Sequence, residues 1–213
     1  MIKVIFFDFD GVIVESVDIK TNAFAKLFEQ EGEEVVKKVV DYHLKNGGVS
    51  RYEKFRYIYK EILRRPLNDI EFQGLCNKFA NYVLESVVAA SYVKGALEFL
   101  GNCASQYKCF VVSATPQTEI EEIIQRRDIR KFFRGIYGAP IKKSDAVRDI
   151  LLEEKFESIS AVYIGDAMSD YIAATDNSVK FIARINDNGD IFKDVDCIKV
   201  KDLTGLNAIL LPL

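Results

Sequence analysis

Four aspartates stand just beyond short runs of apolar residues, and such runs are typical of buried β-strands. The first pair follows KVIFF at residues 3–7, and the second pair follows AVYI at residues 161–164. The four aspartates are Asp8, Asp10, Asp166 and Asp170. Carboxylate oxygens are hard ligands, so several of them in one cleft could hold Mg²⁺.

Hydroxyl and ammonium groups follow two further apolar runs. Ser113 and Thr115 come after one of these runs, and the pair Lys142–Lys143 comes soon after the other. In an open sheet of parallel strands, ligands bind beyond the carboxyl ends of the strands, so all these groups would converge on one crevice. Hydroxyls and lysines bind phosphate oxygens, so the set as a whole suits a site for magnesium and a phosphate group.

Alternating strands and helices would place these groups together. After the first strand, the candidate strands are residues 109–112, 135–137, 161–164, 180–183 and 197–200. Helical patterns separate them at residues 93–105, 117–126, 144–155 and 169–176. Such alternation predicts an α/β fold with a Rossmann-like parallel β-sheet core flanked by helices.

The stretch from residue 16 to residue 92 contains no convincing strand. Apolar residues recur there at spacings of three and four, which indicates amphipathic helices. These patterns lie around residues 19–28, 35–40, 52–62 and 75–87. The turn signal Asn-Gly-Gly precedes Ser50, which suits the N-cap of the third helix. We therefore predict an α/β core of residues 1–15 and 93–213, with an all-helical insertion of residues 16–92.

The overall charge argues against two classes of partner. Lysine and arginine number 29 and aspartate and glutamate 32, so the formal net charge is −3. Nucleic-acid-binding proteins usually carry a basic surplus. No run approaches the roughly 18 apolar residues of a membrane span, and the apolar run at the N-terminus is too short for a signal peptide. We expect neither nucleic acid nor a membrane as a partner.

Cysteine and histidine usage narrows the chemistry further. The four cysteines form no CxxC pair, so we expect neither disulfides nor a zinc site, and we expect a cytoplasmic location. The single histidine, His43, excludes a histidine-based triad and a multi-histidine metal site. We expect His43 on the surface of the inserted helices.

In four places the sequence resembles the motifs of the haloacid dehalogenase-like hydrolase superfamily. The segments are DFDGVIVES at residues 8–16, Ser113-Ala114-Thr115, a lysine of the pair Lys142–Lys143, and GDAMSD at residues 165–170. The helical insertion lies where this superfamily carries its C1 caps. The resemblance spans essentially the whole chain and is to the branch of phosphoglycolate phosphatases and β-phosphoglucomutases.

This resemblance implies roles for the four aspartates. Asp8 would be the nucleophile, and Asp10 would be the general acid and then the base, with its backbone carbonyl on Mg²⁺. Asp166 would be a side-chain metal ligand. Asp170 would bind the metal or orient water and the lysine, and it also suits the N-terminus of a helix. Mg²⁺ is thus the expected cofactor, held by Asp8, Asp10, Asp166 and Asp170.

The resemblance also implies residues that bind the phosphate group. Gly11, Ser113 and Ala114 would contact the substrate, and one lysine would offset the charge between Asp8 and the phosphate. We favour Lys143 over Lys142 because KSDAVRDIL resembles the KxxAL pattern of the family, although the sequence leaves both open.

Arg51 of the insertion and Glu15, the last residue before it, have alternative interpretations. The segment GVSR at residues 48–51 resembles a specificity loop that places an arginine over a sugar phosphate, so Arg51 would contact the substrate. Arg51 could instead be an N-terminal helix residue without a ligand. Glu15 could lie near the metal, but we favour a place at the hinge into the insertion.

The expected function is that of a magnesium-dependent phosphatase that acts through an aspartyl-phosphate on a small phosphate ester, such as a sugar phosphate or phosphoglycolate. A β-phosphoglucomutase-like mutase is the alternative, but the forms KKSD and GDAMSD favour a phosphatase. A dehalogenase is less favoured because it needs no leaving-group acid such as Asp10. A non-catalytic protein that binds a phosphorylated ligand is a minor alternative. The sequence does not reveal the oligomeric state.

Overall fold

A single parallel sheet of six strands forms the centre of the computed structural model, which describes residues 1–186 and 189–213. The strands are β1 (Val4–Phe7), β2 (Lys108–Pro116), β3 (Gly135–Ala139), β4 (Ala161–Gly165), β5 (Lys180–Arg184) and β6 (Ile198–Val200). Their order across the sheet is β3-β2-β1-β4-β5-β6. The predicted α/β fold with a parallel sheet is confirmed.

The strand order puts β1 at a switch point of the sheet. The chain adds β2 and β3 on one side of β1, and then crosses to add β4, β5 and β6 on the other side. Phe7 is in register with Val111 on one neighbour and with Ile164 on the other. A crevice forms at the carboxyl ends of strands where the order reverses, so the residues after β1 and β4 share one crevice.

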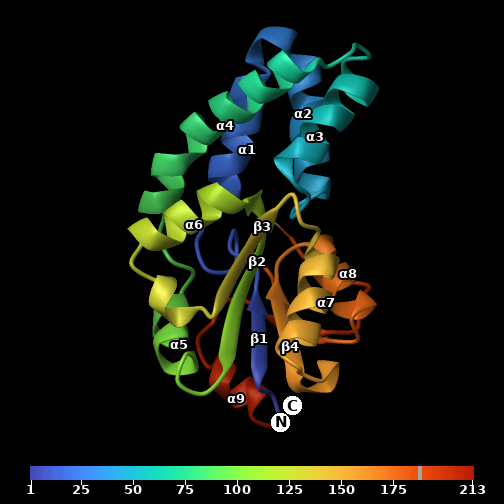
Figure 1. Cartoon of the computed structure of the whole chain (residues 1–213). Helices are drawn as coiled ribbons and strands as arrows, with labels where there is room; N and C mark the ends of the chain where they lie inside the picture. Colours follow the sequence, from blue (N-terminus) through green and yellow to red (C-terminus); the bar gives the residue numbers. More distant parts are fainter. Residues whose placement is uncertain (187–188) are drawn as a thin grey trace.

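Helices cover both faces of the sheet (Figure 1). The core helices are α5 (Ala96–Cys103), α6 (Gln117–Arg126), α7 (Lys143–Glu153), α8 (Met168–Asp176) and α9 (Leu206–Leu210). Alternate residues of β1 are buried in two separate clusters: Ile5 and Phe7 in one, Val4 and Phe6 in the other. A strand that is apolar throughout is expected when a parallel sheet is covered on both sides.

The segment of residues 16–92, called the cap, is helical and lies beyond the carboxyl ends of the strands (Figure 1). Its helices are α1 (Val17–Leu27), α2 (Glu33–Lys45), α3 (Arg51–Tyr57) and α4 (Asp69–Ala89), and a π-helical turn (Ile58–Ile62) extends α3. Phe24 lies with its ring centroid 4.7 Å from that of Phe79 and 5.6 Å from that of Phe55. The predicted N-cap is confirmed, since the Ser50 hydroxyl accepts the backbone N–H of Glu53.

Two linkers join the cap to the core, and they run side by side. Val14 forms an antiparallel bridge with Tyr92, and the backbone N–H of Glu15 donates to the carbonyl of Ser91 at 2.9 Å. The domain boundaries at residues 15/16 and 92/93 stay a prediction, and this pairing supports them. Glu15 lies at the entrance to the cap, where we expected it.

Strand β2 is longer than predicted, and this changes the placement of two hydroxyls. Ser113 and Thr115 lie within β2 rather than after it. The pairing with β3 jumps from Val112↔Tyr137 to Pro116↔Ala139, so three residues of β2 lie opposite one residue of β3. Such a bulge bends a strand and redirects its side chains.

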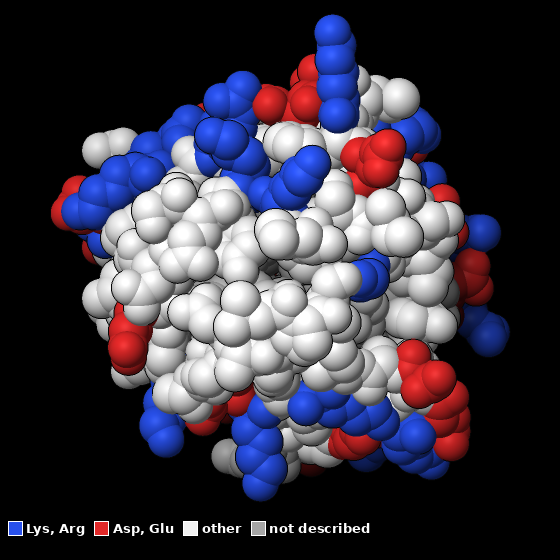
Figure 2. Space-filling view, turned by 90° about the horizontal axis from the view of Figure 1, so that it is seen from below, with Lys and Arg blue, Asp and Glu red and all other residues white. Residues whose placement is uncertain are grey.

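Charges of both signs are mixed on the end of the molecule opposite the cap. Figure 2 shows lysines, arginines and acids around an uncharged centre on this face, rather than one continuous basic surface. None of the described helices has the length and apolar character to cross a membrane. Within the described chain the four cysteines are free thiols, although the sulfurs of Cys103 and Cys109 lie 3.0 Å apart.

Candidate active site

Three carboxylates meet at the crevice between β1 and β4. Asp8 follows β1, Asp166 follows β4, and Asp170 lies in the first turn of α8. One oxygen from each carboxylate lies within 4.8 Å of the other two. This set of oxygens fits a hard divalent cation such as Mg²⁺, for which Asp8, Asp166 and Asp170 could all supply ligands.

A buried ammonium group stands between two of these acids. Lys143 Nζ lies 2.9 Å from Asp8 Oδ2 and 2.6 Å from Asp170 Oδ1. Lys143 is the first residue of α7, and its neighbour Lys142 is exposed. Of the two candidate lysines, the structure therefore brings Lys143 to the acids. The other oxygen of Asp170 accepts the backbone N–H of Ala167, so this acid also caps α8.

Burial and crowding change the ionisation of the cluster. Burial raises the pKa of Asp8 to about 7, Lys143 opposes this rise, and the charges of Asp170 and Asp10 add to it. Burial and the charges of Asp8 and Asp170 raise the pKa of Asp166 well above its usual range. Asp170 and Asp8 raise the pKa of Lys143 despite its burial. The acids outnumber the nearby cation, and a divalent ion would balance the excess charge.

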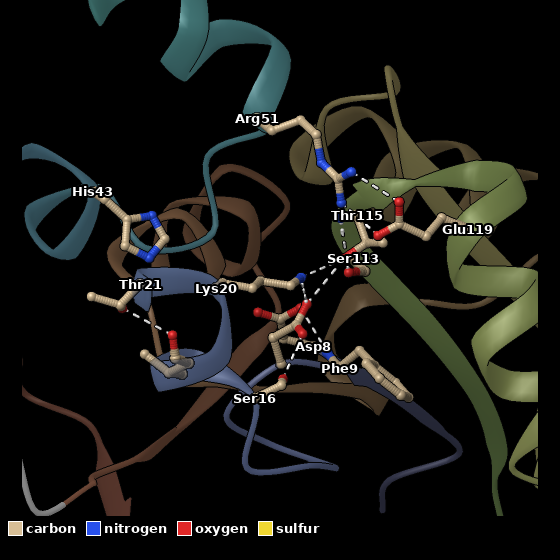
Figure 3. A network of polar contacts seen from close by, with 12 residues as sticks. Asp8, Phe9, Ser16, Lys20, Thr21, His43, Arg51, Ser113, Thr115 and Glu119 are labelled. Atoms are coloured by element: carbon tan, nitrogen blue, oxygen red, sulfur yellow. Dashed lines mark hydrogen bonds and ion pairs between the residues drawn. The ribbon is translucent and has the colours of Figure 1, made fainter. Parts of the chain in front are cut away.

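Asp10 lies in a different environment, surrounded by three donors, and Figure 3 labels the residues that supply them, Ser16, Lys20 and Thr115. Ser16 Oγ donates to Asp10 Oδ1 at 2.6 Å, and Thr115 Oγ1 donates to Oδ2 at 3.0 Å. Lys20 of α1 forms an ion pair with Oδ2 and also donates to the hydroxyl of Thr115. Burial favours the neutral acid, but Lys20 and the two hydroxyls outweigh it and lower the pKa of Asp10.

The turn after Asp10 requires a glycine. Gly11 has a φ of +75°, and a Cβ atom there would lie 2.0 Å from Asp166 Oδ2. Arg184 Nη1 donates to the Gly11 carbonyl at 3.3 Å, while Nη2 lies 2.6 Å from Glu15 Oε1. The turn therefore lies close to Asp166, and Arg184 of β5 holds its backbone through the Gly11 carbonyl.

The bulge of β2 borders the same crevice. Ser113 is buried, and its hydroxyl accepts the backbone N–H of Thr115 at 3.1 Å. Ala114 and Thr115 line the cavity described next. The structure thus places the predicted phosphate-binding residues Gly11, Ser113 and Ala114 around the crevice that contains Asp8 and Asp10. Their contact with a substrate stays a prediction.

Between the cap and the core lies a cavity of about 270 Å³. Asp8, Asp10 and Asp166 line it from the core, and Lys20 and Lys54 line it from the cap. The glycine turn of the cap reaches the start of α8. There Ser169 Oγ donates to the Gly47 carbonyl at 3.4 Å, and a Cβ atom on Gly48 would lie 2.1 Å from Ser169 Oγ.

Arg51 lines the cavity but is already bound by the core. Its two terminal nitrogens lie 2.9 and 2.5 Å from the oxygens of Glu119 on α6, and its guanidinium carbon lies 4.4 Å from the ring centroid of Phe79. Both charged side chains are more than nine-tenths buried. The Arg51–Glu119 pair therefore joins the cap to the core (Figure 3). A substrate contact by Arg51 stays a prediction.

The expectation that His43 lies on the cap surface is wrong. His43 is 7% exposed, its ring centroid lies 4.5 Å from that of Phe24, and it lines the cavity. The reason is the position of the residue on α2, because Val39 and His43 lie one turn apart on its buried face. The sequence did carry a signal for this burial, because Val39 precedes His43 by four residues and residues at this spacing share one face of a helix.

The cations around the site were not predicted from the sequence. They are Lys20, Lys54 and Arg184, together with the acid Glu119. Lys20 had a local signal, because it follows Ser16 by four residues and such residues share one face of a helix. The pairing of Arg184 with Glu15 had no local signal, since the two residues lie 169 positions apart in the sequence.

Comparison with known proteins gives a family match over most of the chain. The model of the haloacid dehalogenase-like hydrolases matches residues 5–184. No curated protein matches the sequence significantly.

Several solved structures share the fold over their whole length. A predicted phosphatase from Clostridium acetobutylicum is 17% identical, with a TM-score of 0.78 over 100% of both chains. CbbY from Rhodobacter sphaeroides in complex with phosphate is 17% identical, with a TM-score of 0.76 over 100% of both chains. A CbbY mutant in complex with xylulose-(1,5)bisphosphate is also 17% identical, with a TM-score of 0.73 over 97% of this chain and 96% of that one.

A structure bound to magnesium is also similar. It is the HAD-hydrolase YfnB from Bacillus subtilis, which is 15% identical, with a TM-score of 0.74 over 99% of both chains. At these identities the likenesses show the fold.

The acid cluster predicts that Mg²⁺ stabilises the protein more at pH 8 than at pH 6. The raised pKa values of Asp8 and Asp166 mean that protons must leave before a metal binds. Without metal, the cluster should lose stability as pH rises through about 7, because charge then accumulates in a buried site. Thermal denaturation with and without Mg²⁺ at both pH values measures this difference.

Matched variants check the origin of that effect. Asp166→Asn should remove most of the Mg²⁺-dependent rise in Tm, while Asp149→Asn, a change on the exposed face of α7, should leave it intact. An equal rise at both pH values, or a rise that survives Asp166→Asn, would show that the ion binds elsewhere.

The Arg51–Glu119 pair predicts a loss of stability. Arg51→Ala leaves a buried carboxylate without a partner, which typically costs about 3–5 kcal/mol. Urea denaturation should show this loss, and the double variant Arg51→Met/Glu119→Leu should recover most of it. The control Arg65→Ala, which breaks the more exposed pair with Glu31, should cost less than about 1 kcal/mol. Unchanged stability with a loss of activity on sugar phosphates alone would instead place Arg51 on the substrate.

Proposed function

Because this chain belongs to the haloacid dehalogenase-like hydrolase family, we propose that it is a magnesium-dependent phosphomonoester phosphatase that works through an aspartyl-phosphate on Asp8. The observation that carries the proposal is the position of Lys143 Nζ, within 2.9 Å of Asp8 and 2.6 Å of Asp170. The substrate is a small phosphate ester, and the protein acts in the cytoplasm.

In the first step, a carboxylate oxygen of Asp8 attacks phosphorus, and the bond from phosphorus to the ester oxygen breaks. The side chain is held for this attack: Oδ1 accepts the backbone N–H of Phe9 at 2.7 Å, and Oδ2 contacts Lys143. Holding the nucleophile in one orientation lowers the entropy cost of the reaction. The positive charge of Lys143 opposes repulsion between Asp8 and the phosphate.

Asp10 donates a proton in the first step and accepts one in the second. As an acid it protonates the departing oxygen, and as a base it then takes a proton from the water that cleaves the aspartyl-phosphate. Its lowered pKa keeps the carboxylate ionised, which is the form that a base requires. A phosphate group entering the cavity brings negative charge, which raises the pKa of a nearby carboxyl group and so favours the acid.

Mg²⁺ would be held by the carboxylates of Asp8, Asp166 and Asp170 together with the carbonyl of Asp10, and it would neutralise the charge of the phosphate oxygens. The cluster geometry supports the three carboxylates as ligands, and the magnesium-bound YfnB structure supports the choice of ion. Ser113, Ala114 and Gly11 would bind the phosphate oxygens from the core side of the cavity.

A phosphosugar mutase is the second candidate. It would use the same Asp8 but would hold the aspartyl-phosphate until a sugar hydroxyl arrives. The forms KKSD and GDAMSD, which differ from those of the mutases, favour attack by water. The fold shared with CbbY bound to phosphate is compatible with either reaction.

Two variants should separate nucleophile from acid. Asp8→Asn should lower kcat by roughly a thousandfold or more on every phosphate ester, because the covalent step is lost. Asp10→Asn should spare aryl phosphates with good leaving groups more than alkyl phosphates, since a good leaving group needs little protonation. Steady-state hydrolysis across a series of leaving groups measures the difference. Equal losses for both variants throughout the series would contradict the assigned roles.

Release of inorganic phosphate should decide between phosphatase and mutase. We expect steady, Mg²⁺-dependent release from monophosphates without a bisphosphate activator, and loss of this activity in EDTA. Hexose phosphates followed by NMR should show hydrolysis. Interconversion of the 1- and 6-phosphates with negligible phosphate release would support the mutase, and full hydrolysis in EDTA would rule out the metal.

A further inference from the structure

Lys54 of α3 is a buried cation on the cap side of the cavity. It is 3% exposed, and its ammonium lies 2.9 Å from His43 Nδ1 and 3.4 Å from the carbonyl oxygen of His43. Its nitrogen also lies 5.6 Å from the ring centroid of Phe24. These neighbours are neutral, so they solvate the ammonium without balancing its charge.

Among the described residues, the other buried or partly buried cations at this cavity each have an acid. The pairs are Lys20–Asp10, Arg51–Glu119, Arg184–Glu15 and Lys143 with Asp8 and Asp170. Among the described residues, no carboxylate lies within ion-pair distance of Lys54. Within the described part of the chain, Lys54 is thus a buried cation at this cavity without a carboxylate partner.

An unbalanced buried ammonium is unfavourable, and its ionisation reflects this. Burial lowers the pKa of Lys54 to about 7, and repulsion from Lys20 and Lys143 adds to this effect, against a smaller attraction from Asp10. Burying a charge without a partner costs several kcal/mol, so such groups usually have a role. A ligand that brings a negative group to Lys54 would restore its charge and remove the penalty.

His43 completes a pair of donors. Burial and the nearby Lys54 lower the pKa of His43 to about 2, so the ring is neutral. An ammonium can only donate, so when Lys54 is charged, Nδ1 accepts from it and the ring proton is on Nε2. Figure 3 shows the ring projecting from the cap towards the space beside Lys20. Lys54 has three N–H groups and uses two on His43, so one remains for a ligand.

We propose that Lys54 and His43 form a second anion-binding subsite, which receives a phosphate or carboxylate at the far end of the substrate. This inference rests on the proposed function, because the first phosphate occupies the site at Asp8. The physiological substrate is then a phosphate ester with two anionic ends, and Lys54 rather than Arg51 selects it. Arg51 has its charge balanced by Glu119, and Lys54 does not.

A purely structural role for Lys54 has a different consequence. The carbonyl of His43 lies in the last turn of α2, and a lysine there stabilises the end of a helix. Loss of such a contact would lower stability and reduce activity on all substrates by the same factor. A role in binding would instead change the ratio of kcat/KM between substrates with two anionic ends and substrates with one, so this ratio is the quantity to measure.

The test compares alkanediol bisphosphates with the monophosphates of the same diols, using tethers of two to six carbons. The wild-type protein should favour the bisphosphate in kcat/KM at one tether length. Lys54→Met should lower this preference by roughly tenfold to a hundredfold, the range for a hydrogen bond to a charged group. Lys54→Arg should retain part of the preference because it retains the charge. The control Lys60→Met removes an exposed lysine of the cap and should leave the preference unchanged.

Two results would overturn the subsite: a wild-type protein without preference at any tether length, or a Lys54→Met variant that keeps the preference. The wild-type comparison holds even if Lys54→Met does not fold. If no ester is hydrolysed at all, the proposed function fails instead. Calorimetry on Asp8→Asn protein then still tests the subsite, since the bisphosphate should bind at least tenfold more tightly than the monophosphate, and equal affinities would exclude it.

Discussion

The ion pairs of Lys143 with Asp8 and Asp170 are the interaction on which the site depends. Carboxylates so close together repel one another in a buried crevice, and removing the cation from a buried pair costs several kcal/mol. The fold meets this constraint through the order of its strands. β1 and β4 are neighbours, so Asp8 and Asp166 meet, while α7 begins with the lysine that separates Asp8 from Asp170.

Small residues make this crowding possible. A Cβ atom on Gly11 would lie 2.0 Å from Asp166, and a Cβ atom on Gly165 would lie 2.2 Å from that of Asp170. Either change would push a carboxylate out of the cluster. The DxDG and GDxxxD motifs therefore contain their glycines for steric reasons as well as for the turn, and each glycine makes room for an aspartate of the fourth motif.

Local patterns in the sequence predicted the parallel sheet, the helical insertion and the four motifs, because strand and helix periodicity and strand-end residues are local properties. The resemblance of KSDAVRDIL to the KxxAL pattern of the family favoured Lys143, and the structure places this lysine beside Asp8 and Asp170. Contacts between distant segments could not be predicted in this way. The pairing of Arg51 with Glu119 joins residues 68 apart in the sequence, and it depends on how the cap sits on α6. The bulge that carries Ser113 into β2 likewise arises from tertiary packing, whereas the spacing of Val39 and His43 on α2 did indicate the burial of His43.

Charge balance links the cap to the chemistry of the core. Lys20 belongs to α1, yet its ammonium holds Asp10 and the hydroxyl of Thr115 in the core. An opposite charge near a carboxyl group lowers its pKa, so the ionisation of Asp10 depends on the position of α1. Movement of the cap away from the core would remove Lys20 and admit water together. The ionisation of Asp10 is therefore coupled to the position of the cap, which also borders the cavity beside Asp8 and Asp10.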